Sequence, residues 1–307
     1  MNNLENLTIV IVTYKTDNTI LNNCINSIDK NVKIKIIENS IKRNKKTLLN
    51  KDNKNLSLYY TGKNLGYGGG NNYGFNLVDT NYVIVANPDI VFHKTFFDNL
   101  KKYLDKGLDF TIIGSTYYKD KSFASSGLFK ENKQVKNKKK ITSDLNKTLK
   151  SLKKVDWVTG CMMVINLKKF NTRKIFDENF FLYFEEFDLC KRLNLINENV
   201  FRAKDLLIEH LGYRGSFASN PENKVEAEKL REWHWMWSTF YFYKKNYGYF
   251  FALKKNIGKL IRSAFKIIFY TLTFNKNVKS KYLSRFLGLF NSIIGKKSLY
   301  RVNNKYQ

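Results

Sequence analysis

The chain has 307 residues, 43% of them hydrophobic, which is enough to bury a substantial core and excludes disorder over most of its length. Its 54 Lys+Arg residues against 26 Asp+Glu residues give a formal net charge of +28, which indicates an anionic partner: nucleic acid, a phosphate-bearing substrate or an anionic membrane surface. The three cysteines, Cys24, Cys161 and Cys190, are scattered and odd in number, which argues against a disulfide framework and predicts buried thiols in a reducing compartment.

Strand-like and helix-like segments alternate through the first part of the chain. The apolar run from Leu7 to Val12 is too short for the core of a signal peptide and predicts a first strand. Strands are predicted at Leu7–Thr13, Lys33–Glu38, Leu56–Tyr60 and Tyr82–Ala86, and helices near Asn18–Lys30, Gly70–Val78 and Lys94–Asp105. This order predicts a parallel, right-handed α/β sheet.

One of the two prolines in the chain, Pro88, follows the apolar strand at Tyr82–Ala86. Proline has no N–H to donate to a sheet, so the strand stops there and delivers Asn87 and Asp89 to its carboxyl end. Ligands bind at the carboxyl ends of strands in open α/β sheets, so a carboxylate on this turn suits a metal or a polar ligand. The alternative is that Asn-Pro-Asp is only a turn.

The middle of the chain contains one polar stretch and then returns to apolar patterns. Residues Lys119 to Lys154 are polar and lysine-rich, which predicts an exposed, mobile excursion. The pattern from Val155 to Ile165 is strand-like, and a helix that carries Leu189 and Leu193 is expected after a group of aromatic and acidic residues. No stretch offers about 20 uncharged apolar residues, so no membrane-spanning helix is predicted.

Beyond His210 the chain predicts a helical extension. Pro221 suits the first position of a helix capped by Asn220, which would run through "VEAEKLREWHWMWSTFYFYKK". Its closely spaced tryptophans cannot share one face, so the helix is expected to be covered on several sides or to meet a lipid interface; they are Trp233, Trp235 and Trp237.

The segment from Tyr247 to Lys297 combines aromatic and aliphatic residues with basic ones. The basic residues include Lys254, Lys255, Lys259, Arg262 and Lys266. Basic amphipathic helices with bulky apolar faces lie on anionic membranes. The alternative, a tail that packs on the rest of its own chain, stays open.

Seven motifs follow one another between Leu7 and Ser216, each at or near the end of a predicted element. In chain order they are "IVTYK", "IENS", "NLGYGGGNNYG", "NPDI", "DWVTG", "FDENFFLYFEEFDLCKR" and "EHLGYRGS". With these motifs the chain resembles the inverting family 2 glycosyltransferases of the GT-A fold, and most of all their rhamnosyltransferase-like members. The resemblance implies an α/β domain with a Rossmann-like GT-A sheet over residues 1–216, followed by a helical, basic and aromatic extension over residues 217–307.

The resemblance also implies a site for a nucleoside-diphosphate sugar and a divalent cation, Mg²⁺ or Mn²⁺. Asp89 matches the last acid of the family motif called DXD, in which Asn87 replaces the first acid, and His210 matches a late histidine that completes the metal site in relatives. Hard cations take oxygen ligands and share them with substrate phosphates. Glu38, where relatives carry aspartate, and Asn39 are expected to meet the base or ribose. The other donor-binding residues that the resemblance implies are Thr13, Tyr14, Asn64, Gly66, Tyr67, Gly70, Asn71 and Asn87.

The glycine-rich run has two interpretations. The glycines from Gly66 to Gly70 permit close backbone approach and open a helix whose N-terminus can face phosphate. The alternative is a flexible turn. Their spacing does not match a dinucleotide-binding fingerprint.

Inversion requires a base that takes the proton from the acceptor hydroxyl as this hydroxyl attacks the anomeric carbon. The resemblance places the base at Glu186, where relatives carry an aspartate, and Glu185 is the alternative. Both acids, together with Asp188, would also suit the first turn of a helix without any catalytic role. The acceptor-binding residues that the resemblance implies are Trp157, Gly160 and Tyr183.

We therefore expect a metal-dependent hexosyltransferase that moves a hexose or deoxyhexose, rhamnose among them, to a cell-surface glycan or a lipid-linked acceptor. It is expected in the cytoplasm, peripheral on the inner face of the membrane, with the C-terminal extension on the anionic surface and no nucleic-acid partner. The alternatives are a basic nucleic-acid-binding protein, for which the sequence offers no recognised module, and a nucleotide-sugar-binding protein made inactive by Asn87 and Glu186. A nucleotidyltransferase is disfavoured, because "TYKTDNT" follows the first strand instead of a glycine-rich basic loop.

Overall fold

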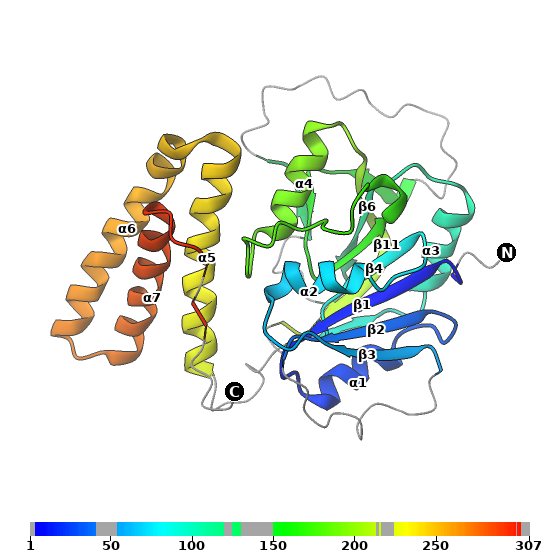
Figure 1. Ribbon diagram of the computed structural model, residues 1–307, viewed down its shortest axis with the longest axis horizontal. Coiled ribbons are helices and arrows are strands. Elements are labelled where there is room, and N and C mark those ends of the chain that lie inside the picture. Colours follow the sequence, from blue (N-terminus) through cyan, green and yellow to red (C-terminus); the bar gives the residue numbers. More distant parts are fainter. Residues whose placement is uncertain are drawn as a thin grey trace. The chain divides into compact units, whose positions relative to one another are not determined.

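The computed structural model describes residues 4–40, 54–119, 125–129, 150–212, 215, 224–298 and 300–301. The chain divides into two compact units (Figure 1). The first consists of Met1–Asn64, Gly70–Phe176 and Glu186–Ser216, and the second of Leu65–Gly69, Asp177–Glu185 and Phe217–Gln307. The second unit therefore contains two short segments from the N-terminal two thirds of the chain as well as the C-terminal extension.

A single large sheet forms the centre of the first unit. Its described strands follow the order β3-β2-β1-β4-β10-β6-β11-β5, with β8 paired to β11. The strands are β1 (Leu7–Thr13), β2 (Lys33–Glu38), β3 (Leu56–Tyr60), β4 (Tyr82–Ala86), β5 (Ile90–Phe92), β6 (Ile112–Tyr117), β8 (Leu152–Lys154), β10 (Met162–Asn166) and β11 (Val200–His210). A separate short pair joins β7 (Ser126–Gly127) to β9 (Trp157–Val158).

The sheet is mixed, whereas the sequence predicted a parallel one. Strands β3, β2, β1 and β4 run parallel as predicted. Strand β10 is antiparallel to both β4 and β6, and β5 is antiparallel to β11. The directions of β10 and β5 are set by pairing with strands far apart in the chain, which the order of strand-like and helix-like segments does not report.

The predicted polar excursion at Lys119–Lys154 contains ordered structure at both ends. Strand β7 lies in it, and Lys153 and Lys154 in β8 pair with β11. This part of the prediction is therefore wrong, because lysines on an edge strand can still contribute backbone hydrogen bonds to the sheet. Residues 120–124 and 130–149 lie outside the described residues.

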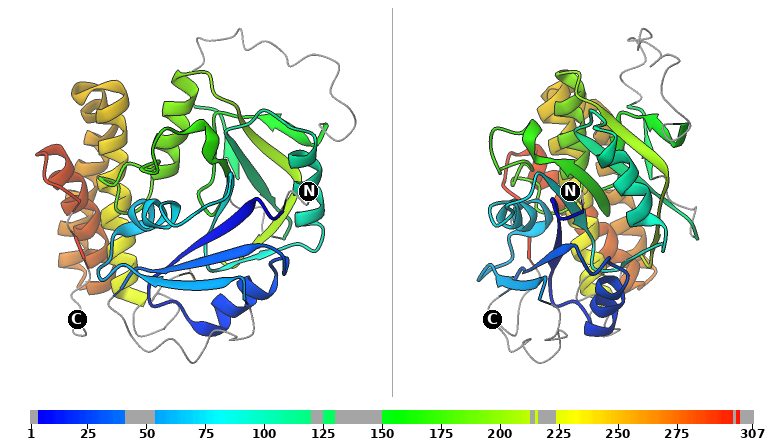
Figure 2. Two further views of the ribbon diagram at one scale, coloured as in Figure 1. Left: turned by 45° about the vertical axis from the view of Figure 1, so that its right-hand side comes forward. Right: turned by 90° about the vertical axis from the view of Figure 1, so that its right-hand side faces the viewer.

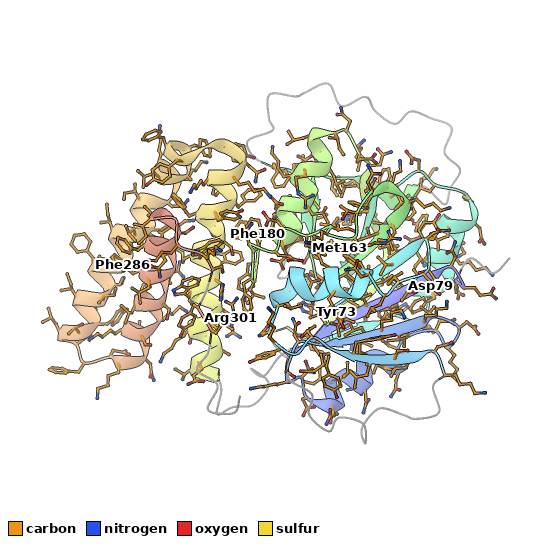
Figure 3. The ribbon with its side chains drawn as sticks, viewed as in Figure 1. Tyr73, Asp79, Met163, Phe180, Phe286 and Arg301 are labelled. Atoms are coloured by element: carbon orange, nitrogen blue, oxygen red, sulfur yellow. The ribbon has the colours of Figure 1, made fainter. Side chains whose placement is uncertain are left out.

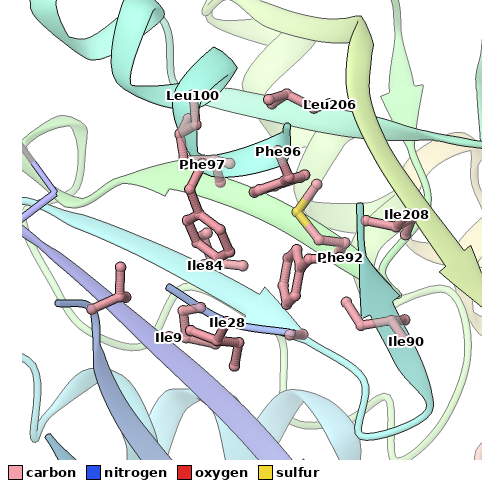
Figure 4. Packing of buried hydrophobic residues seen from close by; sticks show 14 of the residues in the cluster. Ile9, Ile28, Ile84, Ile90, Phe92, Phe96, Phe97, Leu100, Leu206 and Ile208 are labelled. Atoms are coloured by element: carbon pink, nitrogen blue, oxygen red, sulfur yellow. The ribbon is translucent and has the colours of Figure 1, made fainter. Parts of the chain in front are cut away.

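Helices cover both faces of the sheet. On one face, α1 (Asn18–Asn26) and α3 (Phe96–Asp105) pack over Ile9 and Ile84 (Figure 4). The rings of Phe92 and Phe96 meet edge to face with centroids 4.7 Å apart. Each such buried side chain contributes about 1.5–3 kcal/mol relative to exposure, so this cluster fixes the ends of β4 and β5 firmly. A short 3₁₀ helix, Leu167–Lys169, follows β10.

The opposite face carries α2 (Gly66–Phe75), which begins one turn earlier than the predicted start at Gly70. Glycine disfavours helix, so the sequence indicated a later start. In the structure, a Cβ on Gly74 would lie 2.5 Å from Val10 Cγ1, and a Cβ on Gly70 would lie 2.8 Å from Val12 Cγ1. The glycines thus let the helix backbone approach β1 closely, and this packing outweighs their low helix propensity.

The second unit contains three long helices in its described part, α5 (Lys224–Tyr247), α6 (Tyr249–Leu272) and α7 (Lys276–Ile293), which lie side by side (Figure 2). The predicted helical extension is confirmed for α5, while the predicted start at Asn220 and Pro221 lies outside the described residues. The backbones of α5 and α7 approach closely, since a Cβ on Gly288 would lie 2.2 Å from the Trp233 carbonyl oxygen. Across the described helices, none is long and apolar enough to span a bilayer.

The tryptophans of α5 divide between two environments. Trp233 and Trp237 are buried, and Trp237 Nε1 donates to the Lys296 carbonyl at 2.9 Å. Trp235 is 44% exposed. The expectation that they cannot share one face is confirmed, and α5 is covered on several sides, because Ser238, Thr239 and Phe240 are buried as well as Trp233 and Trp237.

Candidate active site

The carboxyl ends of β1 and β2 place a buried glutamate at the edge of the sheet. The parallel register pairs Thr13 with Glu38, and Glu38 is 1% exposed. Its carboxylate accepts hydrogen bonds from Thr13 Oγ1 at 2.7 Å, Ser40 Oγ at 2.8 Å and the Lys15 amide at 3.1 Å. The carboxylate of Glu38 therefore ties the two strand ends together and is held in one orientation.

Asn39 lies in the same place, between β1 and the start of α2. Its amide N–H donates to the Thr13 carbonyl at 2.8 Å, and its Oδ1 accepts from Thr61 Oγ1 at 3.2 Å. A Cβ on Gly70 would lie 2.9 Å from Asn39 Nδ2. The structure thus brings together Thr13, Glu38, Asn39 and Gly70, which the sequence had assigned to donor binding.

Four further predicted donor residues also lie in the first unit. Tyr14 follows β1, where the Lys15 ammonium lies 5.4 Å from its ring centroid. Asn64 precedes α2, and Asn71 is fully buried within α2. The Asn87 amide donates to the Cys161 carbonyl at 2.8 Å, which fixes the Asn87–Asp89 turn to the β9–β10 connection.

Asp89 and His210 meet because β5 pairs antiparallel with β11. The register sets Ile90 opposite His210, so the residue before β5 lies beside the last residue of β11. Asp89 is 2% exposed, its Oδ1 lies 3.4 Å from His210 Nε2, and its carbonyl accepts from the Leu211 amide at 2.9 Å. The sequence predicted this pair from the resemblance alone.

The donor atoms of Asp89 and His210 fit a small divalent cation. Neighbouring ligands of an octahedral Mg²⁺ or Mn²⁺ are about 3 Å apart, close to the 3.4 Å between Oδ1 and Nε2. Gly215 lies next to Asp89, and any larger residue there would crowd the carboxylate, because a Cβ on Gly215 would lie 2.9 Å from Asp89 Oδ1. In the part of the chain that the structure describes, no group of three His, Cys, Asp or Glu is placed to hold a metal, so the remaining ligands would be substrate phosphate and water.

Tyr117 links this pair to the β9–β10 connection. Its ring stacks on the imidazole of His210 with centroids 6.0 Å apart and an interplanar angle of 17°. Its hydroxyl lies 3.1 Å from Cys161 Sγ and donates to Thr159 Oγ1 at 3.3 Å. Burial raises the pKa of Cys161 to about 12, and the charges of Asp89 and Glu186 both add to the rise, although hydrogen bonds from Tyr117 and Thr159 oppose it. Cys161 therefore lies within electrostatic reach of both carboxylates.

Glu186 lies in the first turn of α4 (Glu185–Leu195), next to Gly160. A Cβ on Gly160 would make ordinary contacts of 3.4–3.5 Å with the Glu186 side chain. Burial raises the pKa of Glu186 to about 7, although amide N–H groups of Glu186, Phe187 and Gly160 lower it in part. Among the described residues, Glu186 Oε2 is buried and has no hydrogen-bond partner. This carboxyl group can change protonation state near neutral pH, as a general base must.

The third acid of the same turn, Asp188, has a structural role. Its side chain is fully buried and accepts from Arg192 Nε at 2.9 Å, while Arg192 Nη2 donates to the Ile175 carbonyl at 2.6 Å. This i, i+4 pair stabilises α4 and joins it to the segment before Asp177. The non-catalytic interpretation of the acids thus fits Asp188.

Trp157 and Gly160, the predicted acceptor residues of the first unit, lie on β9 and on the turn that follows it. The Trp157 ring contacts Phe187 with centroids 4.8 Å apart, and a Cβ on Gly127 would lie 2.7 Å from it. Trp157 and Phe187 thus form an aromatic wall next to the Gly160–Glu186 contact.

The remaining predicted site residues, Gly66, Tyr67, Tyr183 and Glu185, belong to the second unit. The Tyr67 amide donates to the Phe181 carbonyl at 2.9 Å. Gly66 has φ +79°, and a Cβ added to it would lie only 2.3 Å from the same carbonyl oxygen. Gly66 therefore has to be glycine for two reasons, its left-handed backbone and this close approach. Glu185 is buried at 5% exposure.

The segment Asp177–Glu185 is held by several contacts inside the second unit. Tyr183 and Phe184 both have positive φ, 68° and 70°, and both rings contact Trp235, with centroids 5.3 and 5.2 Å apart. Ser238 Oγ donates to the Leu182 carbonyl at 2.9 Å. The Arg301 guanidinium lies 3.4 Å from the ring centroid of Phe181. Figure 3 labels Arg301 and Phe180, the residue that precedes Phe181 in the chain. These contacts stabilise two consecutive aromatic residues in a backbone region that they rarely adopt.

Sequence reasoning missed several residues that shape the site. Asn72 Nδ2 donates to the Phe176 carbonyl at 2.9 Å, and the Phe176 amide donates to Asn72 Oδ1 at 3.0 Å. Tyr117 and Gly215 were also missed, although Tyr117 is the last residue of an apolar strand, a position where site residues gather. Nothing local in the sequence indicates that Gly215 contacts Asp89.

Comparisons with known proteins agree on one family. Residues 8–186 match the family model described as glycosyl transferase family 2. The low-salt glycan biosynthesis hexosyltransferase Agl10 of Haloferax volcanii is 28% identical over 212 residues, which cover 64% of this chain and 64% of the relative. The rhamnosyltransferase WbbL of Escherichia coli is 26% identical over 198 residues, which cover 57% of this chain and 69% of the relative.

One similar solved structure is the mannosyltransferase PcManGT from Pyrobaculum calidifontis, in complex with GDP-Man and Mn²⁺. The TM-score is 0.53 at 8% sequence identity, and the match covers 94% of this chain and 87% of that chain. At this identity the likeness concerns the fold.

Proposed function

Because the chain belongs to glycosyl transferase family 2 and has the GT-A fold, we propose that it transfers a hexose or deoxyhexose by single displacement with inversion. The observation that carries this proposal is the meeting, around Cys161 and Tyr117, of a buried Asp89–His210 pair and a carboxyl group with a raised pKa. The Asp89–His210 pair suits a cation bound to the donor diphosphate, and the carboxyl group of Glu186 suits a general base. A protein that only holds nucleotide would not require the base.

Asp89 and His210 are the residues that would hold Mg²⁺ or Mn²⁺ together with the diphosphate of the donor. The cation would neutralise the negative charge that develops on the departing diphosphate. Glu38, Asn39 and Thr13, whose hydrogen bonds join the ends of β1 and β2, would receive the nucleoside. The similar PcManGT was solved with GDP-Man and Mn²⁺, which supports a nucleotide-sugar donor and a divalent cation of this kind.

Glu186 takes the proton of the acceptor hydroxyl in this proposal. The acceptor oxygen forms the new bond to the anomeric carbon, and the bond from that carbon to the phosphate oxygen breaks with its electron pair on the nucleoside diphosphate. The amide N–H groups of Gly160 and Phe187 keep the Glu186 carboxylate oriented. Glu185 remains the alternative base. Trp157 would contact the acceptor sugar.

The names of the relatives support the proposed donor and acceptor classes. Agl10 is a hexosyltransferase and WbbL is a rhamnosyltransferase, which supports a hexose or deoxyhexose donor. We propose a glycan or lipid-linked acceptor, since Agl10 belongs to glycan biosynthesis.

The direct test is product stereochemistry. The purified chain is incubated with a panel of nucleotide sugars and octyl glycosides as simple acceptors, with and without Mn²⁺, and the product is analysed by proton NMR. We expect consumption of one donor and a product whose anomeric configuration is opposite to that of the donor. A product that retains the configuration would contradict single displacement. Tight nucleotide binding without consumption of any donor would favour an inactive nucleotide-sugar-binding protein.

A further inference from the structure

We propose that the outer face of α6 docks on an anionic lipid bilayer and holds the protein peripherally at the cytoplasmic membrane surface. This inference concerns location and is independent of glycosyl transfer. It rests on the distribution of apolar and basic side chains on α6 and on the turn after it.

Exposed apolar side chains recur along one side of α6 at helical spacing. They are Ile257, Ile261, Phe265, Ile268, Leu272 and, in the following turn, Phe274, and we name them the α6 stripe. Phe265 is 69% exposed, Leu272 is 73% exposed and Phe274 is 86% exposed. Single exposed apolar residues are ordinary, but a continuous stripe of large ones marks an interaction surface.

The turn after α6 points its aromatic residue outward at a conformational cost. Phe274 has φ +55°, in the left-handed region that bulky residues rarely adopt. Its amide donates to the Thr271 carbonyl at 3.3 Å, and the next residue, Asn275, caps α7 through Val278 N. The side chain nevertheless is almost fully exposed to water, so the strain brings no burial within the described structure.

The other side of α6 is already occupied. Ala252, Asn256 and Ser263 are buried, and the α5–α7 bundle shares a core of Met236, Phe240, Ala252 and Leu289. Lys259 belongs to this inner side, because its Nζ donates to Asn256 Oδ1 at 3.0 Å and burial lowers its pKa. Lys259, one of the basic residues noted in the sequence, is therefore not part of the outer face.

Basic residues flank the α6 stripe. Lys254, Lys255 and Arg262 are exposed on α6, and the Lys266 ammonium lies over the rings of Phe269 and Tyr270, 5.8 and 5.5 Å from their centroids. Every charged residue of the sequence after Glu232 is Lys or Arg. Long basic side chains beside an apolar face can reach lipid headgroups while the apolar residues enter the upper acyl region.

Charge selects the bilayer over a second copy of the chain as the occupant. Two copies that met through this face would bring two basic, acid-free surfaces together, which costs free energy. An anionic leaflet offers both an apolar interior and negative charge. The face thus matches a lipid surface in both respects.

The test measures flotation of the full chain with vesicles of phosphatidylcholine, alone or mixed with phosphatidylglycerol. We expect salt-sensitive binding to the mixed vesicles only. The double variants Phe265→Ser/Leu272→Ser and Lys255→Glu/Arg262→Glu should each reduce the bound fraction about tenfold or more. The matched control, Lys94→Glu/Lys102→Glu, changes two exposed lysines near α3 by the same charge and should bind as the wild type does.

Circular dichroism and nucleotide binding by the same variants establish that they are folded, so a loss of flotation reflects the surface. Equal flotation of wild type and both stripe variants, or no binding to anionic vesicles, would overturn the proposal. A dimer in sedimentation that Phe265→Ser/Leu272→Ser dissolves would overturn it in favour of a second copy. None of these outcomes depends on sugar transfer, so failure of the docking surface and failure of the proposed enzyme activity are distinguishable.

Discussion

The carboxyl group of Glu186 lies in the first turn of α4, where burial raises its pKa to about 7 against the opposing backbone N–H groups. A general base works only when it is deprotonated, so we expect the rate of transfer to rise with pH and level off above about 7. Glu186→Gln should lower kcat by about 10²–10⁴-fold and abolish this rise.

The control for that variant is Glu178→Gln, which changes an exposed glutamate of the preceding segment. It should leave the pH profile unchanged. A profile of Glu186→Gln that matches the wild type would assign the base to another group, with Glu185 as the first candidate.

The raised pKa of Glu186 also predicts a pH dependence of folding stability. The folded-state pKa of about 7 lies above the ordinary value of 4.5, so the folded state binds more protons between these values. The free energy of unfolding should therefore fall as pH rises from about 4.5 to about 7. Glu186→Gln should remove this decrease and raise stability at pH 8 by on the order of 1–3 kcal/mol. Urea denaturation at pH 5 and pH 8 measures it, and a variant no more stable than wild type at pH 8 would contradict the burial of this carboxyl group.

At the residue scale, the sequence predicted which residues belong to the site better than it predicted which of them contact one another. The Asn-Pro-Asp turn and the acids at 185–188 stand out because their residue types end a strand and begin a helix. The contact of Asp89 with His210 depends on the pairing of β5 with β11, segments far apart in the chain, so it came only from the resemblance. The stack of Tyr117 on His210 and the approach of Gly215 to Asp89 join segments far apart in the chain, which the sequence pattern does not report.

At the scale of the element, α2 tests whether its glycines are required for packing. Gly74→Ala would place a Cβ 2.5 Å from Val10 Cγ1 and 3.2 Å from Ile37 Cγ1. Overpacking typically costs about 1–3 kcal/mol, against a gain in helix propensity of about 1 kcal/mol. We therefore expect a net destabilisation in thermal or urea unfolding.

The matched control is Gly258→Ala in α6, where a Cβ meets nothing within 4 Å. This variant should be neutral or more stable than the wild type, because only helix propensity changes. Two glycine substitutions within helices should thus have opposite effects. Stabilisation by Gly74→Ala would contradict the close approach of α2 to β1.

The segment Asp177–Glu185 gives a second prediction at this scale. Lys245 Nζ lies 2.7 Å from Asp177 Oδ2, and Tyr241 donates to the same oxygen at 3.3 Å. The segment leads directly into Glu186 along the chain, so loosening it should disturb the base. We expect Lys245→Met to lower kcat about tenfold with little change in the KM for the donor.

The neighbouring lysine provides the control, because Lys244 is exposed and Lys244→Met removes the same charge. It should leave kcat unchanged. If both variants lower kcat equally, the loss of one positive charge explains the decrease. The ion pair between Lys245 and Asp177 then has no positioning role.

The bounds of the first four strands were predictable to the residue. Strands β1, β2, β3 and β4 begin and end where the sequence predicted, since polar or turn residues follow each of them. The start of α2 was missed because tertiary packing outweighs the low helix propensity of glycine. The antiparallel β10 was missed because its direction depends on pairing with β4 and β6, which lie far from it in the chain, and the apolar pattern does not report such pairing.

At the scale of the whole molecule, the basic charge is unevenly distributed. All acidic residues precede residue 233, and the helices α6 and α7 carry only positive charge. Composition alone predicted an anionic partner without choosing among nucleic acid, phosphate and membrane. The family match and the Asp89–His210 pair favour a phosphate-bearing substrate for the first unit, and the α6 stripe favours a membrane for the second.

The measurement that tests the central claim most directly is calorimetric binding of UDP, dTDP and GDP, each with and without Mn²⁺. The variants are Asp89→Asn, which keeps the shape of the side chain, and Asp98→Asn as a control on an exposed acid of α3. We predict that one nucleotide binds in a metal-dependent manner to the wild type and to Asp98→Asn, and that Asp89→Asn loses this binding. Equal binding by Asp89→Asn and wild type, or no binding of any nucleotide, would contradict a donor site built on Asp89 and His210.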